Sequence, residues 1–217
     1  MEPKRISAVE DVLSGKVEIS DFMERLRNDP ELPDAVEQLI PAEARENSEH
    51  SFWKGFSKFS DLATVSARQI LTEAYQYAPW DKLGGDLDAA DALYRMYCYW
   101  FPNTAMTTMY KERYSLFLNA VGDYFEGPDV AETLYTIIEQ ALKEKTKKAQ
   151  KAVAKALITE QFHLEGRKRP YWIQGAEWPM GVNSPMKYLS KKRNGEQVTY
   201  TFQDVDTLEI REVVQFY

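Results

Sequence analysis

Residues 170–181 read Pro-Tyr-Trp-Ile-Gln-Gly-Ala-Glu-Trp-Pro-Met-Gly, and they lead into the segment that decides the fold of this chain. That segment contains Asn194-Gly195, the clearest turn signal in the sequence. Both central residues of a type I′ hairpin turn need a positive φ, which Gly and Asn adopt more readily than other residues. The sequence therefore predicts a β-hairpin centred on Asn194 and Gly195.

The predicted turn determines which residues face one another across the hairpin. Leu189 is expected opposite Tyr200, and the apolar residues of the second strand share one face: Val198, Tyr200 and Phe202. A turn at residues 204–207 leads to a third strand, whose apolar residues also share a side: Leu208, Ile210, Val214 and Phe216. We expect a three-stranded antiparallel meander with one packed face and one solvated face.

A meander of this size is only marginally stable by itself, so its apolar face needs a cover. Residues 170–185 are rich in bulky aromatic side chains and prolines, which is not the composition of a flexible linker. Trp172 and Trp178 are expected to fill the seam between the sheet and the helices. Large aromatic side chains also dominate interfaces, so the alternative is that the two tryptophans contact a partner.

Upstream of this segment, apolar residues recur with helical spacing. The pattern predicts helices near residues 6–13, 21–27, 34–39, 41–46, 61–77, 86–101, 110–125, 130–141 and 145–162. Gly84-Gly85 is interpreted as a turn, and Ser7 precedes Glu10 at the spacing of a capping box. The predicted fold class is α+β, mainly a helical bundle. Residues 1–166 form the helical part and pack as one domain with the tryptophan-rich segment and meander of residues 167–217.

Composition indicates a globular protein of the cytoplasm. Hydrophobic residues make up 44% of the chain and aromatic residues 13%, enough for a sizeable core. No apolar run approaches the ~20 residues that cross a bilayer, and the first residues lead into no signal-peptide core. The single cysteine, Cys98, rules out an internal disulfide and fits a reducing compartment. We expect a cytoplasmic location without membrane contact.

Charge is distributed unevenly along the chain. The net charge of −7 combines −12 over residues 1–142, with 13 basic and 25 acidic residues, and +5 over residues 143–217, with 14 and 9. An acidic surface disfavours nucleic acid and suits a basic protein partner. Carboxylates cluster between residues 29 and 49, and the candidate partner-binding residues among them are Asp29, Glu31, Asp34 and Glu37. The alternative is a solvated acidic face without a partner.

Asp86, Asp88 and Asp91 are a second set of acidic candidates for partner binding. A calcium loop of the EF-hand type is not indicated, because its terminal Glu is missing. The first turn of a helix favours acidic residues, and Asp91 precedes Arg95 at the spacing of a helical ion pair. A structural role and partner binding are both kept as interpretations.

No catalytic or metal-ligating pattern stands out. His50, His163 and Cys98 lack paired ligand spacing, so neither a metal nor another cofactor is expected. Gly-x-Ser-x-Gly and Gly-x-Gly-x-x-Gly motifs are absent, and Cys98 lies on the apolar stripe of a predicted helix. The sequence predicts a protein that is not an enzyme. An enzyme whose site is assembled from distant carboxylates is the alternative.

A basic stretch offers a further alternative. It begins at Lys143, runs along the last predicted helix, and ends with Arg167, Lys168 and Arg169. The apolar residues of that helix share the opposite side, which favours a solvated amphipathic face over a nucleic-acid footprint. A nucleic-acid-binding or adaptor protein that uses residues 143–169 is kept as an alternative hypothesis.

Three pieces of the C-terminal sequence carry a resemblance. They are Trp172-Ile173-Gln174 with Glu177-Trp178-Pro179, then Ser184-Pro185-Met186, and the ending Val214-Gln215-Phe216-Tyr217. With them the chain resembles small bacterial cytosolic immunity proteins of polymorphic-toxin and contact-inhibition systems. The resemblance implies a protein that binds and blocks one cognate protein toxin, and a basic nuclease would suit an acidic inhibitor. It implies no particular contact residues, and the sequence favours no oligomeric state.

Overall fold

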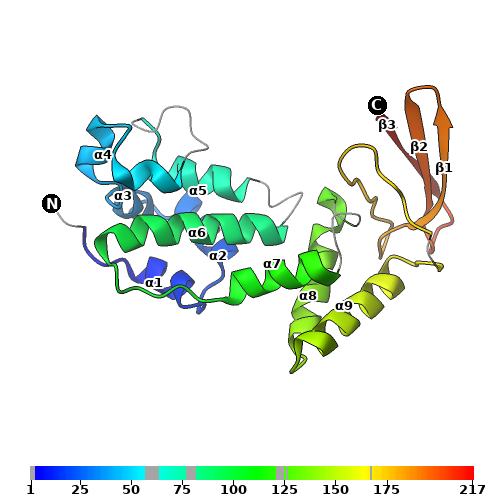
Figure 1. Ribbon diagram of the computed structural model, residues 1–217, viewed down its shortest axis with the longest axis horizontal. Coiled ribbons are helices and arrows are strands. Elements are labelled where there is room, and N and C mark those ends of the chain that lie inside the picture. Colours follow the sequence, from blue (N-terminus) through cyan, green and yellow to red (C-terminus); the bar gives the residue numbers. More distant parts are fainter. Residues whose placement is uncertain (1–2, 57–63, 77–81, 121–124, 126, 167) are drawn as a thin grey trace. The chain divides into compact units, whose positions relative to one another are not determined.

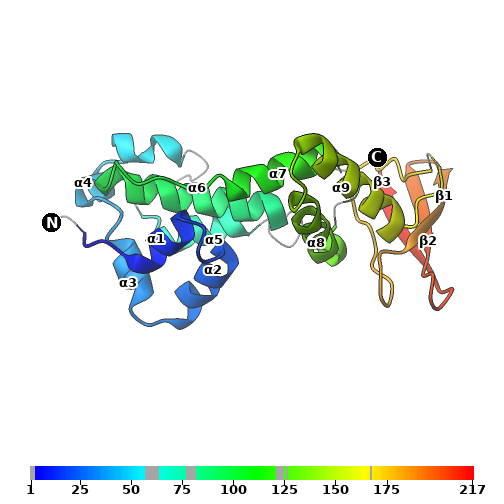
Figure 2. The same ribbon diagram turned by 90° about the horizontal axis from the view of Figure 1, so that it is seen from below.

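The computed structural model describes the chain except for residues 1–2, 57–63, 77–81, 121–124, 126 and 167 (Figures 1 and 2). The chain divides into two compact units, which we call unit 1 (residues 1–77 and 84–111) and unit 2 (residues 78–83 and 112–217). The fold class is α+β, as predicted, with helices followed by a three-stranded antiparallel sheet. That the two units belong to one domain stays a prediction.

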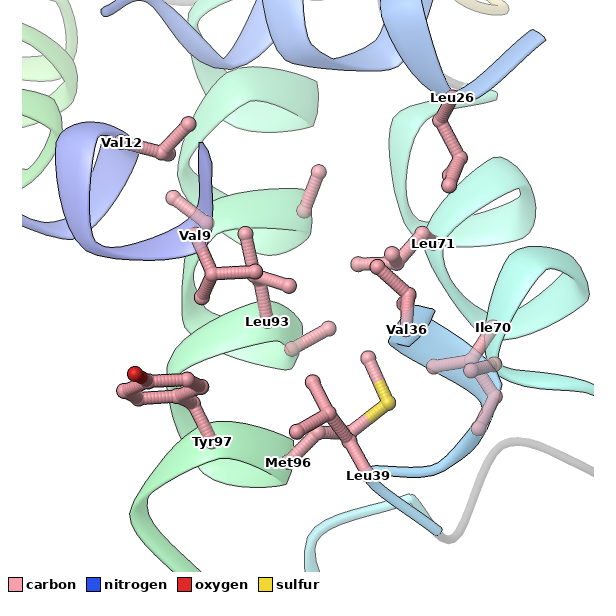
Figure 3. Packing of buried hydrophobic residues seen from close by; sticks show 14 of the residues in the cluster. Val9, Val12, Leu26, Val36, Leu39, Ile70, Leu71, Leu93, Met96 and Tyr97 are labelled. Atoms are coloured by element: carbon pink, nitrogen blue, oxygen red, sulfur yellow. The ribbon is translucent and has the colours of Figure 1, made fainter. Parts of the chain in front are cut away.

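Unit 1 is built from helices around one apolar core. They are α1 (Ser7–Leu13), α2 (Ile19–Asn28), α3 (Leu32–Glu37), α4 (Ala42–Glu46), the 3-10 helix η1 (Ser51–Gly55), α5 (Ala67–Tyr75) and most of α6 (Lys82–Trp100). Figure 3 shows side chains of α1, α2, α3, α5 and α6 meeting in this core. Val9 of α1, Leu71 of α5 and Leu93 of α6 are completely buried in it.

Two predicted helix starts in unit 1 are wrong: residues 64–66 are not helical and α5 begins at Ala67, and α6 begins before residue 86. The chain is already helical at Lys82, so Gly84 and Gly85 lie inside α6, and Asp86 is not in its first turn. A glycine costs a helix about 1 kcal/mol, which the burial of the neighbouring Leu83 offsets. The predicted helical residues 61–63, 77 and 121–124 lie outside the described part of the chain.

The capping box predicted for α1 does not form. Ser7 is the first residue of the helix, and no side chain caps the N-terminus. The carboxylate of Glu10 accepts hydrogen bonds from Arg5 and Tyr97 instead. Tyr97 lies 87 residues along the chain from Glu10, so local sequence spacing does not reveal this competing contact.

Unit 2 combines helices with the sheet. Its elements are α7 (Met109–Ala120) from Glu112 onward, the 3-10 helix η3 (Pro128–Val130), α8 (Ala131–Leu142), α9 (Lys147–Gln161), β1 (Lys187–Asn194), β2 (Gln197–Gln203) and β3 (Ile210–Phe216). Ile138 of α8, Ile158 of α9 and Tyr200 of β2 belong to one core. The sheet therefore covers its apolar face with the helices of its own unit.

The hairpin forms, but its predicted register is wrong. Gly195 and Glu196 make the turn, so Asn194 pairs with Gln197, and Lys191 rather than Leu189 lies opposite Tyr200. Gly195 has a φ of +63°, as the first central residue of a type II′ turn requires. The prediction for β2 is confirmed, because three alternate residues are completely buried: Val198, Tyr200 and Phe202.

The apolar residues of β3 share one side, as predicted, but that side faces the solvent. Val214 pairs with Thr199 and Ile210 with Gln203, and paired residues of neighbouring strands point to the same face. Four side chains near or within β3 are consequently exposed: Leu208, Ile210, Val214 and Phe216. The inward side of β3 carries Gln215, which is completely buried.

The buried amide of Gln215 fastens the tryptophan-rich segment to the sheet. Its Oε1 accepts hydrogen bonds from the backbone N–H groups of Ile173 and Gln174, each at 3.2 Å. Its Nε2 donates to the backbone oxygen of Gly175 at 2.7 Å and to Oε1 of Glu177 at 3.0 Å. All four hydrogen-bonding positions of the amide are thereby used.

Trp178 has the structural role predicted for both tryptophans, whereas Trp172 contacts the sheet and keeps part of its surface exposed. The Trp178 ring is 1% exposed and lies 5.4 Å from the Phe125 ring and 5.0 Å from the Phe162 ring, between centroids. Its Nε1 donates to the backbone oxygen of Met186 at 2.8 Å. Trp172 is half-buried, and its ring centroid lies 4.6 Å from that of Tyr200.

We predict that Gln215→Met lowers the free energy of unfolding by about 2–4 kcal/mol, because methionine fills a similar volume but removes all four hydrogen bonds of the amide and leaves two partly buried backbone N–H groups without an acceptor. Urea denaturation followed by tryptophan fluorescence measures the change. Gln203→Met, on the solvent-facing side of β2, is the control and should change it by less than about 0.5 kcal/mol. Equal losses in the two variants would contradict the fastening role of Gln215.

Candidate functional site

Asp29 has a structural task. Its Oδ1 accepts hydrogen bonds from the backbone N–H groups of Glu31 and Leu32, at 2.9 and 3.2 Å, where α3 begins. These two bonds hold the pKa of Asp29 below its ordinary value. The carboxylate thus satisfies donors that the first turn of a helix leaves without partners.

Glu37 also serves the fold of unit 1. It is ion-paired with Arg45, whose guanidinium donates to the backbone oxygen of Val65. The other carboxylate oxygen of Glu37 accepts from the backbone N–H of Ala67 at 2.7 Å, at the start of α5. Glu37 therefore links α3, α4 and α5.

Glu31 and Asp34 belong to a larger exposed group of carboxylates. Residues 28–49 contain seven acidic residues and one basic residue, Arg45, which is paired with Glu37. Five of the seven are exposed and form no ion pair with any residue that the structure describes: Glu31, Asp34, Glu43, Glu46 and Glu49. We call these five residues the α3–α4 acidic surface.

Asp86, Asp88 and Asp91 do not form one site. Asp86 is buried, Asp88 is exposed, and Asp91 is ion-paired with Arg95 at 2.5 Å between Oδ2 and Nε. The last contact confirms the predicted helical ion pair. Residues two apart on a helix point in different directions, which accounts for the different burial of Asp86 and Asp88. Together the three carboxylates provide no common surface.

The tryptophans differ in their accessibility to a partner. Trp178 is enclosed by aromatic side chains of unit 2, so its ring is not accessible, and the interpretation as a partner contact is wrong for this residue. Trp172 keeps part of its surface exposed beside Tyr171, which is itself 64% exposed.

The basic stretch retains its exposed charges. Four lysines of α9 are exposed: Lys147, Lys148, Lys151 and Lys155. The Arg169 guanidinium lies 5.4 Å from the centre of the Phe125 ring, and Arg167 lies outside the described residues. Nucleic-acid binding by residues 143–169 stays an alternative hypothesis.

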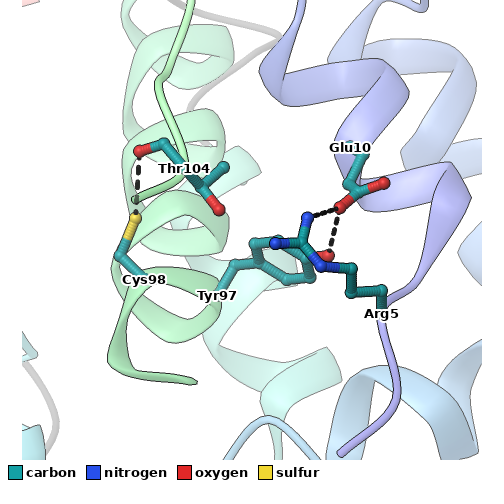
Figure 4. Close-up of polar contacts among 5 residues, drawn as sticks. All are labelled: Arg5, Glu10, Tyr97, Cys98 and Thr104. Atoms are coloured by element: carbon teal, nitrogen blue, oxygen red, sulfur yellow. Dashed lines mark hydrogen bonds and ion pairs between the residues drawn. The ribbon is translucent and has the colours of Figure 1, made fainter. Parts of the chain in front are cut away.

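One cluster of titratable groups joins the chain before α1 to α6 (Figure 4). Oε1 of Glu10 lies 2.5 Å from Nη1 of Arg5 and accepts from the Tyr97 hydroxyl at 2.9 Å. The hydrogen bonds from Arg5 and then Tyr97 lower the pKa of Glu10, while burial raises the pKa of Tyr97 to about 12. Neither shift brings a pKa near neutral pH, where a general acid or base works best.

Cys98 is placed as a structural cysteine. Its Sγ lies 3.7 Å from the backbone oxygen of Thr104 (Figure 4). Burial raises the pKa of the thiol, which keeps it protonated at neutral pH. Nucleophilic cysteines need the opposite shift, because the thiolate is the reactive form.

His163 and Ser184 form a polar pair, with 2.9 Å between Nε2 and Oγ. His163, in the turn that follows α9, has a φ of +50°. Its backbone N–H donates to the backbone oxygen of Glu160, and the backbone N–H of Leu164 donates to the backbone oxygen of Thr159. This is the Schellman arrangement of a helix end. A nucleophilic serine also needs a group that orients the histidine, and no described carboxylate bonds to the other ring nitrogen. The pair ties the end of α9 to the loop before β1.

The described residues contain no group of three or more His, Cys, Asp or Glu side chains placed to hold a metal ion. None of the helices described is both long enough and apolar enough to cross a membrane. Comparisons of the chain with protein-family models, with curated proteins and with solved structures found no match.

We predict that the stabilising contribution of Glu10 is lost in acid. Its pKa lies below the ordinary 4.5 in the folded chain, so the contribution is present above that value and disappears as the pH falls through the folded-state pKa. The difference in unfolding free energy between the wild-type chain and Glu10→Gln should be constant from about pH 7 to 5 and shrink towards about pH 3. Chemical denaturation across this range measures it.

Glu24→Gln is the matched control, because Glu24 is exposed on α2 and forms no ion pair with a described residue. It should reproduce the pH profile of the wild-type chain. A Glu10→Gln difference that stays constant down to about pH 3 would contradict the assigned hydrogen bonds.

Proposed function

We propose that this chain is a noncatalytic protein-binding protein of the immunity type, which binds a cognate bacterial toxin and blocks it. The observation that carries the proposal is the α3–α4 acidic surface, whose carboxylates are exposed in a region where the one basic side chain is already paired. The resemblance of residues 170–217 to immunity proteins supports the same class of function.

The distribution of charge between the units supports a cationic partner. Unit 1 contains 11 basic and 18 acidic residues, whereas unit 2 contains 16 of each, so the whole net charge of −7 belongs to unit 1. Exposed charge of one sign attracts a partner of the opposite sign and raises its association rate. A nuclease toxin has this complementary chemistry, because it must bind a polyanionic substrate.

The test is binding of the full chain to a candidate toxin encoded by a neighbouring gene. We predict that the triple variant Glu31→Lys, Asp34→Lys and Glu43→Lys associates at least about 10-fold more slowly at low salt, because its long-range attraction is reversed. The difference should shrink as the ionic strength rises, since salt screens exposed charges. Biolayer interferometry over a range of salt concentrations measures both effects.

A matched control reverses three exposed carboxylates of unit 2 by Glu160→Lys, Glu196→Lys and Glu209→Lys. It changes the net charge equally and should alter the association rate by less than about 3-fold, because these charges lie outside the acidic surface. Equal effects in both triple variants would remove the role of the α3–α4 acidic surface. A wild-type chain that neither binds nor neutralises the toxin would overturn the proposed function itself.

A further inference from the structure

The outer strands of the sheet, β1 and β3, differ in how they are protected from pairing with another strand (Figure 1). β1 carries a register irregularity between Tyr188 and Ser190 and four basic residues: Lys187, Lys191, Lys192 and Arg193. Irregular pairing and charged side chains are the usual devices that keep an edge strand from associating. β3 pairs with β2 in unbroken register over its whole length and contains no Pro, Gly or Lys, and its only charged residues are Arg211 and Glu212.

The backbone groups at the free edge of β3 belong to its even-numbered residues. At one end of the β2–β3 ladder the backbone N–H of Tyr217 donates to the backbone oxygen of Glu196. At the other end the backbone N–H of Asp204 donates to the backbone oxygen of Glu209. Bonded residues alternate in an antiparallel ladder, so the odd-numbered residues of β3 bond to β2. The N–H and C=O groups that point to the free edge are those of Ile210, Glu212, Val214 and Phe216.

Most of these edge groups form no hydrogen bond with another described residue. In the described part of the chain, one of them has a partner: the Phe216 oxygen accepts from Nε2 of Gln174 at 2.8 Å. A carbonyl oxygen can accept two hydrogen bonds, so this contact leaves room for a second donor. Side chains next to the edge are apolar and exposed, with Ile210 at 50%, Val214 at 41% and Phe216 at 55%.

We propose that β3 pairs antiparallel with β3 of a second copy of this chain, in a register centred on Val213. Ile210 then lies opposite Phe216 of the second copy, and Glu212 opposite its Val214. Every edge N–H and C=O of residues 210–216 obtains a partner, and the exposed apolar side chains of the two strands cover one another. The same surface serves both copies, as in the two-fold interfaces that are commonest among homo-oligomers.

Charge selects this register over its neighbours. A pairing centred on Glu212 sets Glu212 directly opposite its own copy, and one centred on Arg211 does the same with two arginines. Like charges directly opposite one another destabilise a strand pair. A pairing centred on Val214 avoids this clash but joins only residues 212–216. The occupant is therefore a second copy, because the strand complements itself over its full length.

The first test is the mass of the full chain in solution, by light scattering coupled to size exclusion. The wild-type chain is expected at twice its 25.1 kDa. Val214→Pro removes an N–H that points to the free edge and leaves the bonds to β2 in place, so it should give a folded monomer. Val214→Thr keeps that N–H and should remain a dimer. Circular dichroism checks that both variants are folded.

The second test reads the register by cross-linking in a Cys98→Ser background. Val213→Cys lies on the two-fold axis as a non-hydrogen-bonded pair, with Cα atoms about 4.5 Å apart, which suits a disulfide. Ile210→Cys is the control, because its counterpart in the second copy lies far along the strand. A covalent dimer is expected from Val213→Cys alone under mild oxidation.

A wild-type chain that stays monomeric at about 100 μM, a range in which weak specific dimers form, would overturn the proposal. So would a dimer that persists in folded Val214→Pro, or equal cross-linking of the two cysteine variants. These results concern unit 2, whereas toxin binding was assigned to carboxylates of unit 1. Failure of either proposal therefore leaves the other standing.

Discussion

A buried amide cannot turn to water, so each of its donors and acceptors has to find a partner inside the protein. Gln215 meets this requirement because residues 173–177 run across the inner side of β3. The same path brings Trp172 against Tyr200 and sets Trp178 among the aromatic side chains of unit 2. The core of unit 2 thus depends on one polar side chain that holds an irregular segment in place.

Because remote contacts hold unit 2 together, the local sequence predicts only part of its sheet. The alternation of β2 is predictable, because Val198, Tyr200 and Phe202 need a packed face in any register. The position of the turn is not predictable. Gly195 can have its positive φ in a turn centred on Asn194-Gly195 and also in one centred on Gly195-Glu196. In the observed register the Lys191 ammonium donates to the Tyr171 oxygen at 2.7 Å and lies over the Tyr200 ring. Remote contacts of this kind decide between turns that are locally equivalent.

For a related reason, the local sequence does not predict which side of β3 is buried. Hydrophobicity alone places Ile210, Val214 and Phe216 inside, because an unpaired glutamine is costly to bury. A glutamine whose amide is fully hydrogen-bonded carries no such penalty, and Gln215 therefore takes the inner position.

The local sequence also does not predict which of the acidic candidates have structural roles. Asp29 and Glu37 are engaged by backbone N–H groups, yet nothing in the local sequence separates them from the exposed Glu31.

The residues behind the C-terminal resemblance turn out to have structural tasks. Gln174 and Gln215 hold the irregular segment to β3, and Trp178 fills the core. These three residues close the sheet, whereas Val214 and Phe216 of the same C-terminal ending are exposed on β3. The two interaction surfaces that we propose lie in different units: the α3–α4 acidic surface in unit 1 and the free edge of β3 in unit 2.

That separation has a consequence for affinity. The proposed pairing through β3 involves none of the five carboxylates, so such a dimer would present two acidic surfaces instead of one. A toxin with a single basic site would bind each copy with the affinity of a monomer, because nothing links the two binding events. A toxin that is itself dimeric would bind the paired chains more tightly, provided that the span between its sites matches the span between the acidic surfaces. Self-association would therefore increase the preference for dimeric over monomeric toxins without any additional contact at the acidic surface.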